Sequence, residues 1–214
     1  MIGQNGSNRR AAMQVLIACE HSGAVRDAFT RAGHDAMSCD LLDAETPGPH
    51  YKGDVRDVLA HPWGLLIAHP PCTYLCSSGL HWNTRRPERA ILTLEAIEFA
   101  RLFIDSPAVA HIPKRGVENP IGCLSSKIRK PDQIIHPHWF GHDASKATCL
   151  WLVGLPPLRP TAHIAPRYVN GKPRWANQTD SGQNALGPSP DRWKLRSATY
   201  AGIAAAMADQ WGAS

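Results

Sequence analysis

The sequence predicts an α/β fold, in which a mostly parallel sheet carries helices on both faces. Short apolar runs alternate with segments of helical spacing over the first 120 residues, which is the pattern of repeated strand, turn, helix and strand. The apolar runs are continuous, as in strands that are buried on both faces. Polar residues follow directly after several of these runs, and parallel sheets bind their ligands at that edge.

The first four segments illustrate this alternation. Residues 15–19 (VLIAC) form a short apolar run and predict the first strand. Residues 20–23 (EHSG) are a tight polar turn. Residues 24–32 have helical spacing with Val25, Ala28 and Phe29 on one side, and Gly33 ends this helix. Residues 34–41 then predict a second strand, which closes on Asp40.

The central region continues the pattern. Residues 53–57 (GDVRD) predict a turn, and residues 65–68 predict the next strand. The clearest helix covers residues 87–103, with Ile91, Leu94, Ile97 and Leu102 among its apolar positions. Residues 109–112 and 116–117 frame one more strand, which leads into a Glu-Asn-Pro sequence.

The composition of the sequence changes after residue 155, and the regular spacing of apolar residues is lost. Residues 155–193 are dominated by proline, glycine, arginine and tryptophan, and they predict an irregular surface segment without a core of its own. Residues 197–211 return to helix, with Ile203, Met207 and Trp211 at four-residue spacing. At the other end of the chain, residues 1–12 are expected to be a disordered lead-in.

Composition places the chain among ordinary globular proteins. Of its 214 residues 43% are hydrophobic and 19% charged, and a net charge of +5 allows binding to nucleic acid without requiring it. The N-terminus is polar, and no stretch approaches the roughly 20 apolar residues of a membrane span. The six cysteines are therefore expected to be reduced thiols of a cytoplasmic protein, with no membrane partner.

The sequence His69-Pro70-Pro71-Cys72 ends a predicted strand with a cysteine, which has three interpretations. The first is a buried structural thiol. The second is a metal site with His69, Cys76 and His81, but the spacing is a weak zinc signature, so we predict no metal. The third is a nucleophile, because two prolines make the loop rigid where it leaves the sheet.

A glutamate favours the third interpretation. Glu118 follows a predicted neighbouring strand and is expected at the same edge of the sheet as Cys72. A thiolate beside a carboxylic acid suits attack on an electron-poor ring. The thiolate adds to one carbon, and the acid protonates a ring nitrogen.

This combination of residues resembles the DNA (cytosine-5) methyltransferase family, in the form of its small phage or prophage members. Further segments follow in the order of that family. Residues 18–23 resemble its first cofactor loop, residues 40–41 stand where it has an acidic residue for the cofactor ribose, and residues 53–55 resemble the loop that faces the adenine. Residues 145–151 resemble a later segment that supplies a basic residue, and residues 196–211 resemble the C-terminal helix.

The resemblance implies a Rossmann-like fold that uses S-adenosylmethionine to methylate carbon 5 of cytosine in DNA. It implies a catalytic domain over residues 13–154, a reduced recognition segment over 155–193 and a C-terminal helix over 194–214. Catalysis would involve Cys72 as nucleophile, Glu118 at ring nitrogen N3, Asn119 and Lys146. The residues implied to bind the cofactor are Cys19, Glu20, His21, Ser22, Gly23, Asp40, Leu41, Asp54, Val55 and Pro70.

A cytosine within a duplex must be flipped out before attack, so DNA is the implied partner in a bacterial or phage-infected cell. The candidate DNA-binding residues are basic or aromatic: Arg129, Lys130, Arg167, Lys172, Arg174, Trp175 and Arg192.

The sequence departs from the family at four places. Of the glycines usual in the first loop only Gly23 remains, and Glu118-Asn119 is followed by proline where the family usually has valine. Lys146 stands where the family has an arginine, and the recognition segment is short. Two alternatives therefore stay open, namely the same chemistry on a free cytosine nucleotide and a catalytically weak relative that binds DNA or cofactor. A nicotinamide dinucleotide enzyme is disfavoured because the first turn lacks Gly-x-Gly-x-x-Gly.

Overall fold

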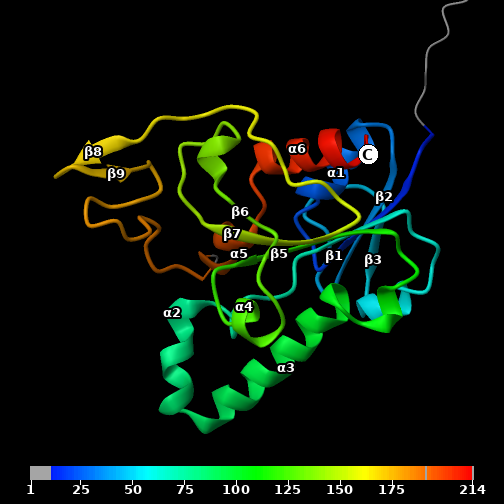
Figure 1. The fold of residues 1–214 in the computed structure, drawn as a ribbon, viewed down its shortest axis with the longest axis horizontal. Coiled ribbons are helices and arrows are strands. Elements are labelled where there is room, and N and C mark those ends of the chain that lie inside the picture. The colour runs from blue at the N-terminus through cyan, green and yellow to red at the C-terminus, as the bar shows by residue number, and fades with distance from the viewer. Residues whose placement is uncertain (1–10, 191, 214) are drawn as a thin grey trace, which may run out of the picture.

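The computed structural model describes residues 11–190 and 192–213, and a seven-stranded sheet forms its centre (Figure 1). The strands lie in the order β3-β2-β1-β4-β5-β7-β6. The first five in this order run parallel, and β7 runs antiparallel to both of its neighbours. The α/β fold predicted from the sequence is therefore confirmed. The strands span Gln14–Ala18 (β1), Asp35–Asp40 (β2), His50–Lys52 (β3), Leu65–Ala68 (β4), Lys114–Pro120 (β5), Gln133–Ile135 (β6) and Thr148–Val153 (β7).

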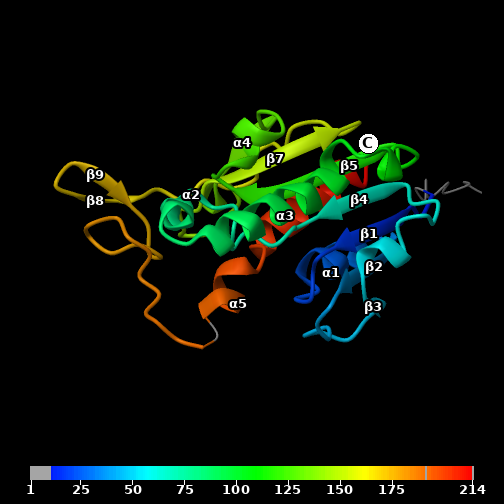
Figure 2. The same ribbon diagram turned by 90° about the horizontal axis from the view of Figure 1, so that it is seen from below.

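Helices cover both faces of the sheet, and each face has its own core (Figures 1 and 2). Helices α1 (Ala24–Arg31) and α6 (Ala201–Trp211) pack on the face that carries Val15 and Ile17 of β1. Helix α3 (Pro87–Ile104) packs on the opposite face, which carries Leu16 and Ala18. Successive side chains of one strand thus enter two different cores, which explains why the apolar runs are continuous.

The remaining elements are short. Helix α2 (Ser77–Leu80) follows the loop after β4, α4 (Leu124–Lys127) follows β5, and α5 (Arg192–Ser197) precedes α6. Strands β8 (Arg167–Val169) and β9 (Lys172–Arg174) form a hairpin, which extends away from the main sheet (Figures 1 and 2).

Five expectations need correction or lie outside the described residues. The run at residues 109–112 is not a strand, because Pro107–Val109 form a 3₁₀ turn capped by Ser106, and β5 begins only at Lys114. Residues 155–193 contain the β8–β9 hairpin, and the last helix begins at Ala201 instead of residue 197. Ile91 and Leu94 of α3 are 59% and 62% exposed, because the N-terminal half of this helix runs past the sheet. Of the expected N-terminal lead-in, residues 1–10 lie outside the described part.

None of the helices in the described ranges has the length and apolar character that crossing a membrane requires.

Candidate active site

The centre of the candidate site is the point where the strand order of the sheet reverses, between β1 and β4. The loops that follow these two strands are residues 19–23 and 69–72, and the backbone N–H of His69 donates to the carbonyl oxygen of Ala18 at 2.9 Å. Open α/β sheets bind ligands outside the carboxyl ends of the strands at such a reversal. The structure therefore brings together the two loops that the sequence analysis singled out.

The loop after β1 is shaped by a left-handed backbone at both ends, with φ of 58° at Cys19 and 75° at Gly23. Between them, the Glu20 carboxylate accepts hydrogen bonds from the backbone N–H groups of Val25 (2.7 Å) and Arg26 (3.2 Å). Glu20 therefore caps the N-terminus of α1 and holds the loop, and the hydroxyl of Ser22 donates to the same carboxylate at 3.3 Å.

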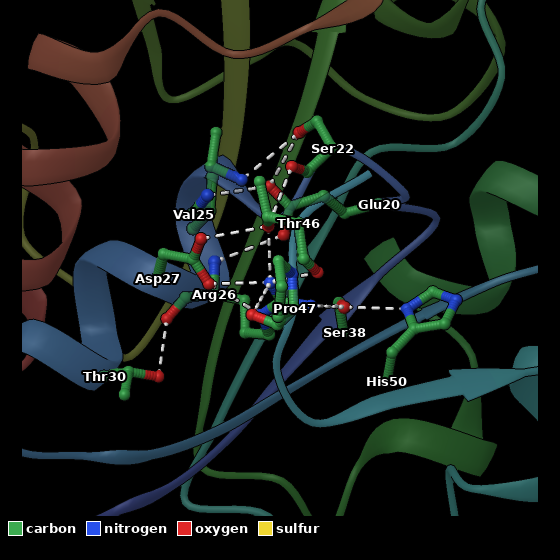
Figure 3. Close-up of polar contacts among 11 residues, drawn as sticks. Glu20, Ser22, Val25, Arg26, Asp27, Thr30, Ser38, Thr46, Pro47 and His50 are labelled. Carbon is green, nitrogen blue, oxygen red and sulfur yellow. Dashed lines mark hydrogen bonds and ion pairs between the residues drawn. The ribbon is translucent and has the colours of Figure 1, made fainter. Parts of the chain in front are cut away.

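A buried arginine ties the next loop, residues 41–49, to helix α1 (Figure 3). The guanidinium of Arg26 is fully buried and pairs with the Asp27 carboxylate at 2.7 Å. It also donates to Ser38 Oγ at 3.3 Å and to Thr46 Oγ1 and the carbonyl oxygens of Thr46 and Pro47 at 2.6, 3.1 and 3.2 Å. Five acceptors around one rigid fork fix the path of the chain beyond Asp40.

Acidic residues follow β2 and β3 on the same edge of the sheet. The Asp40 carboxylate accepts from the backbone N–H of Leu42 at 3.0 Å, and Asp54 pairs with Arg56 at 2.8 Å. Burial raises the pKa of Cys19, and the negative charges of Asp40 and Asp54 raise it further, so these three side chains share one electrostatic environment. Leu41, next to Asp40 in the sequence, is 72% exposed, whereas Val55, next to Asp54, is buried.

The side chains of His69 and Glu118 meet at the ends of β4 and β5. His69 Nδ1 lies 2.9 Å from Glu118 Oε2, and each side chain is only 11% exposed. Burial alone raises the pKa of Glu118. The hydrogen bond with His69, the charge of Lys146 and a hydrogen bond with Thr148 outweigh that effect, so the pKa of Glu118 stays below its ordinary value.

Asn119 connects this strand end to the Pro-Pro-Cys loop. Its side-chain Nδ2 donates to the carbonyl oxygen of Pro70 at 2.7 Å, and the residue is buried. The two prolines leave that loop without two backbone donors, so the bond from Asn119 fixes its position relative to β5. This bond ties the loop that carries Cys72 to the strand that carries Glu118.

Cys72 forms a hydrogen bond with Cys76, a residue that the sequence suggested only as a possible metal ligand. Residues 72–76 form a helical turn, in which the backbone N–H of Cys76 donates to the carbonyl oxygen of Cys72 at 3.0 Å. The thiol of Cys72 forms a hydrogen bond with Cys76, and this bond, burial and the charge of Glu118 raise the pKa of Cys72. The same bond lowers the pKa of Cys76 to about 6, with help from Ser78, Arg196 and Arg89. In the free protein the pair shares one proton, and the thiolate lies on Cys76.

This pairing predicts the alkylation behaviour of Cys76. Because a thiolate is the reactive form, Cys76 should react with iodoacetamide faster than Cys72 at pH 7, and its rate should fall as the pH drops through about 6. In Cys72→Ala the shared hydrogen bond is lost, so the midpoint should move toward the ordinary range of a thiol. Peptide mapping by mass spectrometry after timed quenching measures both rates. Equal rates for the two thiols would contradict the pairing.

Lys146 lies on the other side of the carboxylate. Its Nζ donates to the backbone carbonyl of Arg196 at 2.9 Å, and its charge lowers the pKa of both Cys72 and Glu118. A small pocket opens beside Glu118 between β7 and the start of α6. It is lined by Glu118, Lys146, Thr148, Thr199, Tyr200 and Ile203.

Most candidate DNA-binding residues cluster on the recognition segment, and some of their donors are engaged there. Arg167 pairs with Asp180 at 2.7 Å, and Arg174 donates to the carbonyl of Asp180. The ring of Trp175 stacks on His138 with centroids 4.1 Å apart. Lys172 is exposed, and Arg192 donates to the carbonyl oxygen of Leu186 at 3.0 Å.

Arg129 and Lys130 lie elsewhere. Arg129 pairs with Asp132 at 2.8 Å and donates to the carbonyl of Leu152, which faces Gly116 near the start of β5. The structure thus does not bring Arg129 and Lys130 together with the strand-end residues.

Two further points concern metal sites and cavities within the described ranges. No group of three or more His, Cys, Asp or Glu side chains there could hold a metal ion. A cavity of about 600 Å³ lies between Arg56 and the C-terminal half of α3, and neither Cys72 nor Glu118 lines it.

Residues missed in the sequence are those whose role depends on a distant partner. His69 stands directly before Pro70-Pro71-Cys72, and its position at a strand end next to β5 was the available signal for a contact with Glu118. Arg26 carried no signal, because charged residues in amphipathic helices normally face solvent.

The sheet order, with one antiparallel strand beside the edge strand and a ligand edge at the β1–β4 reversal, defines the Rossmann-like fold of S-adenosylmethionine-dependent methyltransferases. Among solved structures, the chain is similar to a triple mutant of DNMT2 from Spodoptera frugiperda, with 14% identity over 76% of this chain and 57% of that chain and a TM-score of 0.41. It is also similar to the Dnmt2 methyltransferase of S. pombe, with 15% identity over 68% of this chain and 51% of that chain and a TM-score of 0.44.

The chain thus spans little more than half the length of these two structures. No protein-family model matches the chain, and no curated protein matches it.

Proposed function

We propose that this protein methylates carbon 5 of cytosine in DNA, with S-adenosylmethionine as methyl donor and Cys72 as covalent nucleophile. The observation that carries the proposal is the connection between two strand ends. Cys72 lies on the loop after β4, Glu118 lies near the end of β5, and the hydrogen bond from Asn119 to the Pro70 carbonyl ties that loop to β5. A nucleophile and an acid in a fixed relation are what attack on an electron-poor ring requires.

The residues around the β1–β4 reversal fit the proposed cofactor. Asp40 and Asp54 are carboxylates suited to the hydroxyl and amino groups of an adenosine, and the exposed Leu41 offers an apolar surface to its ring. His21 Nε2 is buried and has no partner among the described residues, as is expected of an atom that meets a ligand. The bound cofactor would supply an electrophilic methyl group.

The protein's own residues account for the remaining steps. The Cys72 thiol gives its proton to the thiolate of Cys76, and the Cys72 sulfur then forms a bond to carbon 6 of the base. Glu118 faces ring nitrogen N3, which gains a proton as electrons move into the ring. Carbon 5 becomes nucleophilic and takes the methyl group. The proton on carbon 5 then passes to a solvent base, the ring is restored, and the Cys72 sulfur leaves as a thiolate.

We propose that the DNA lies between the β8–β9 hairpin and α5, where Lys172 and Arg192 are the basic candidates for phosphate contacts. All six cysteines are free thiols, and a nucleophilic cysteine needs reducing conditions, so the proposed location is the cytoplasm of a bacterial or phage-infected cell. The free nucleotide is a second candidate substrate, because Arg167 and Arg174 make contacts within the recognition segment.

The proposal is tested by following label from S-adenosylmethionine into two acceptors, mixed-sequence duplex DNA and deoxycytidine monophosphate. We expect 5-methylcytosine in DNA with the wild type and none with Cys72→Ser. If label entered only deoxycytidine monophosphate, the substrate would be the free nucleotide and not DNA. Cofactor binding without label in either acceptor would overturn the proposed activity and favour a binding module.

A further inference from the structure

We propose that His69 is a positioning residue that holds the Glu118 carboxyl toward N3 of the base and supplies the proton that N3 receives. This inference rests on the proposed function and adds a residue to it. His69 Nδ1 and Glu118 Oε2 are 2.9 Å apart although 49 positions separate the two residues in the sequence. His69 directly follows β4, and Glu118 lies in the neighbouring strand β5, just beyond the last pair of the β4–β5 register.

A proton is needed between Glu118 and the base for a simple reason. N3 of neutral cytosine only accepts hydrogen bonds, and an ionised carboxylate also only accepts them. Two acceptors that face each other without a proton repel. The hydrogen bond with His69, the charge of Lys146 and the bond with Thr148 keep the pKa of Glu118 below its ordinary value despite its burial, so the carboxyl in the free protein is ionised at neutral pH. The proton must therefore come from another group.

The groups that face Glu118 leave His69 as the source. Lys146, from the segment before β7, directs its Nζ to the carbonyl of Arg196 and makes no ion pair with Glu118 within the described ranges. Thr148, at the start of β7, offers a hydroxyl that does not ionise. The charge of Glu118 raises the pKa of both Cys72 and Cys149, and Cys72 gives its proton to Cys76 in the proposed function, so neither thiol supplies the proton at N3.

His69 itself is held in place for this task. Its backbone N–H donates to the Ala18 carbonyl at 2.9 Å, which fixes it at the β1–β4 reversal. Its other ring nitrogen, Nε2, is buried and has no partner within the described part of the chain. The side chain therefore makes its one polar contact there with Glu118.

The proton transfer balances. As the Cys72 thiolate adds to carbon 6, the N–H bond at Nδ1 of the His69 imidazolium breaks, the Glu118 carboxylate takes the proton, and an N–H bond forms at N3. The imidazolium cation of His69 and the thiolate anion of Cys72 thus give neutral products, and no group is oxidised or reduced. When the sulfur–carbon bond breaks at the end of the cycle, the proton returns from N3 through Glu118 to His69.

The test is the release of tritium from carbon 5 of cytosine in labelled DNA, measured in single turnovers between pH 6 and pH 9. His69→Gln keeps a hydrogen-bond donor but cannot release a proton. We expect its rate to fall about 10²-fold, in the range of general acid catalysis. The pH dependence of the rate should differ between the wild type and His69→Gln, because only the wild type carries an ionisable side chain at this position. His111→Gln, which changes an exposed histidine, is the matched control.

A double mutant separates a shared proton from a structural effect. If His69 acts through Glu118, adding His69→Gln to Glu118→Gln should lower the rate no further. Loss of rate by the same factor at every pH, or additive effects in the double mutant, would overturn the role of His69 while leaving the proposed function intact. A wild type that releases no tritium would overturn the proposed function itself.

Discussion

Replacing Cys72 with alanine is expected to abolish the covalent complex with DNA that contains 5-fluorocytosine. In this base the fluorine at carbon 5 cannot leave as a cation, so a sulfur bond at carbon 6 persists once it has formed. The Cys72 side chain is the proposed source of that sulfur. Methylation of ordinary DNA should fall by about 10³-fold or more, the scale on which nucleophile removal acts in covalent enzymes. Denaturing gel electrophoresis detects the complex, and label transfer gives the rate.

Cys123→Ala is the matched control, because it removes another buried thiol from the core on the α3 side of the sheet. This variant should form the complex as the wild type does. A complex that survives in Cys72→Ala, or that maps by mass spectrometry to Cys76, would assign the nucleophile to a different sulfur. Absence of the complex in the wild type would contradict covalent attack altogether.

Replacing Arg26 with methionine is expected to lower the free energy of unfolding by about 3–5 kcal/mol. The guanidinium is fully buried, and its removal leaves the Asp27 carboxylate without its cation. The carbonyl oxygens of Thr46 and Pro47 lose their donor at the same time. Urea unfolding followed by circular dichroism measures the change.

The Arg26 prediction has two comparisons. Arg31→Met, at an exposed position of the same helix, should change the stability by less than about 0.5 kcal/mol. Arg26→Lys should resemble Arg26→Met more than the wild type, since one ammonium cannot reach acceptors arranged for a planar fork. Equal stability of Arg26→Met and wild type would show that the network in Figure 3 contributes little to folding.

The sequence predicted the parallel strands and the α3 and α6 helices because the spacing of apolar residues within a segment indicates which of its faces is buried. Leu65–Ala68 read as a buried strand, and all four residues are buried. The same logic failed at Val109 and Ile112, which are equally buried but pack from a turn. A run of apolar residues indicates that the segment is buried. It indicates a hydrogen-bonded strand only where the backbone can also adopt an extended conformation.

For the candidate site, the sequence could place residues at strand ends but not pair them. Cys72 and Glu118 were expected on one edge because parallel strands present their carboxyl ends together. The contact between His69 and Glu118, and the cap that Glu20 makes on α1, depend on side-chain directions that no local pattern encodes. Glu20 was expected to bind the cofactor, which stays a prediction, and its carboxylate accepts hydrogen bonds from the first turn of α1 and so shapes the loop.

The recognition segment is fastened at both of its ends. At its start, Arg159 and Gln210 exchange two hydrogen bonds of 2.8 and 2.9 Å, and beyond its end the carbonyl of Arg196 accepts from Lys146. Closing a loop between fixed points costs conformational entropy that grows only with the logarithm of its length, at about 0.6 kcal/mol for each doubling. We therefore expect that residues 160–190 can be exchanged for a segment of another length at little cost to the stability of the sheet.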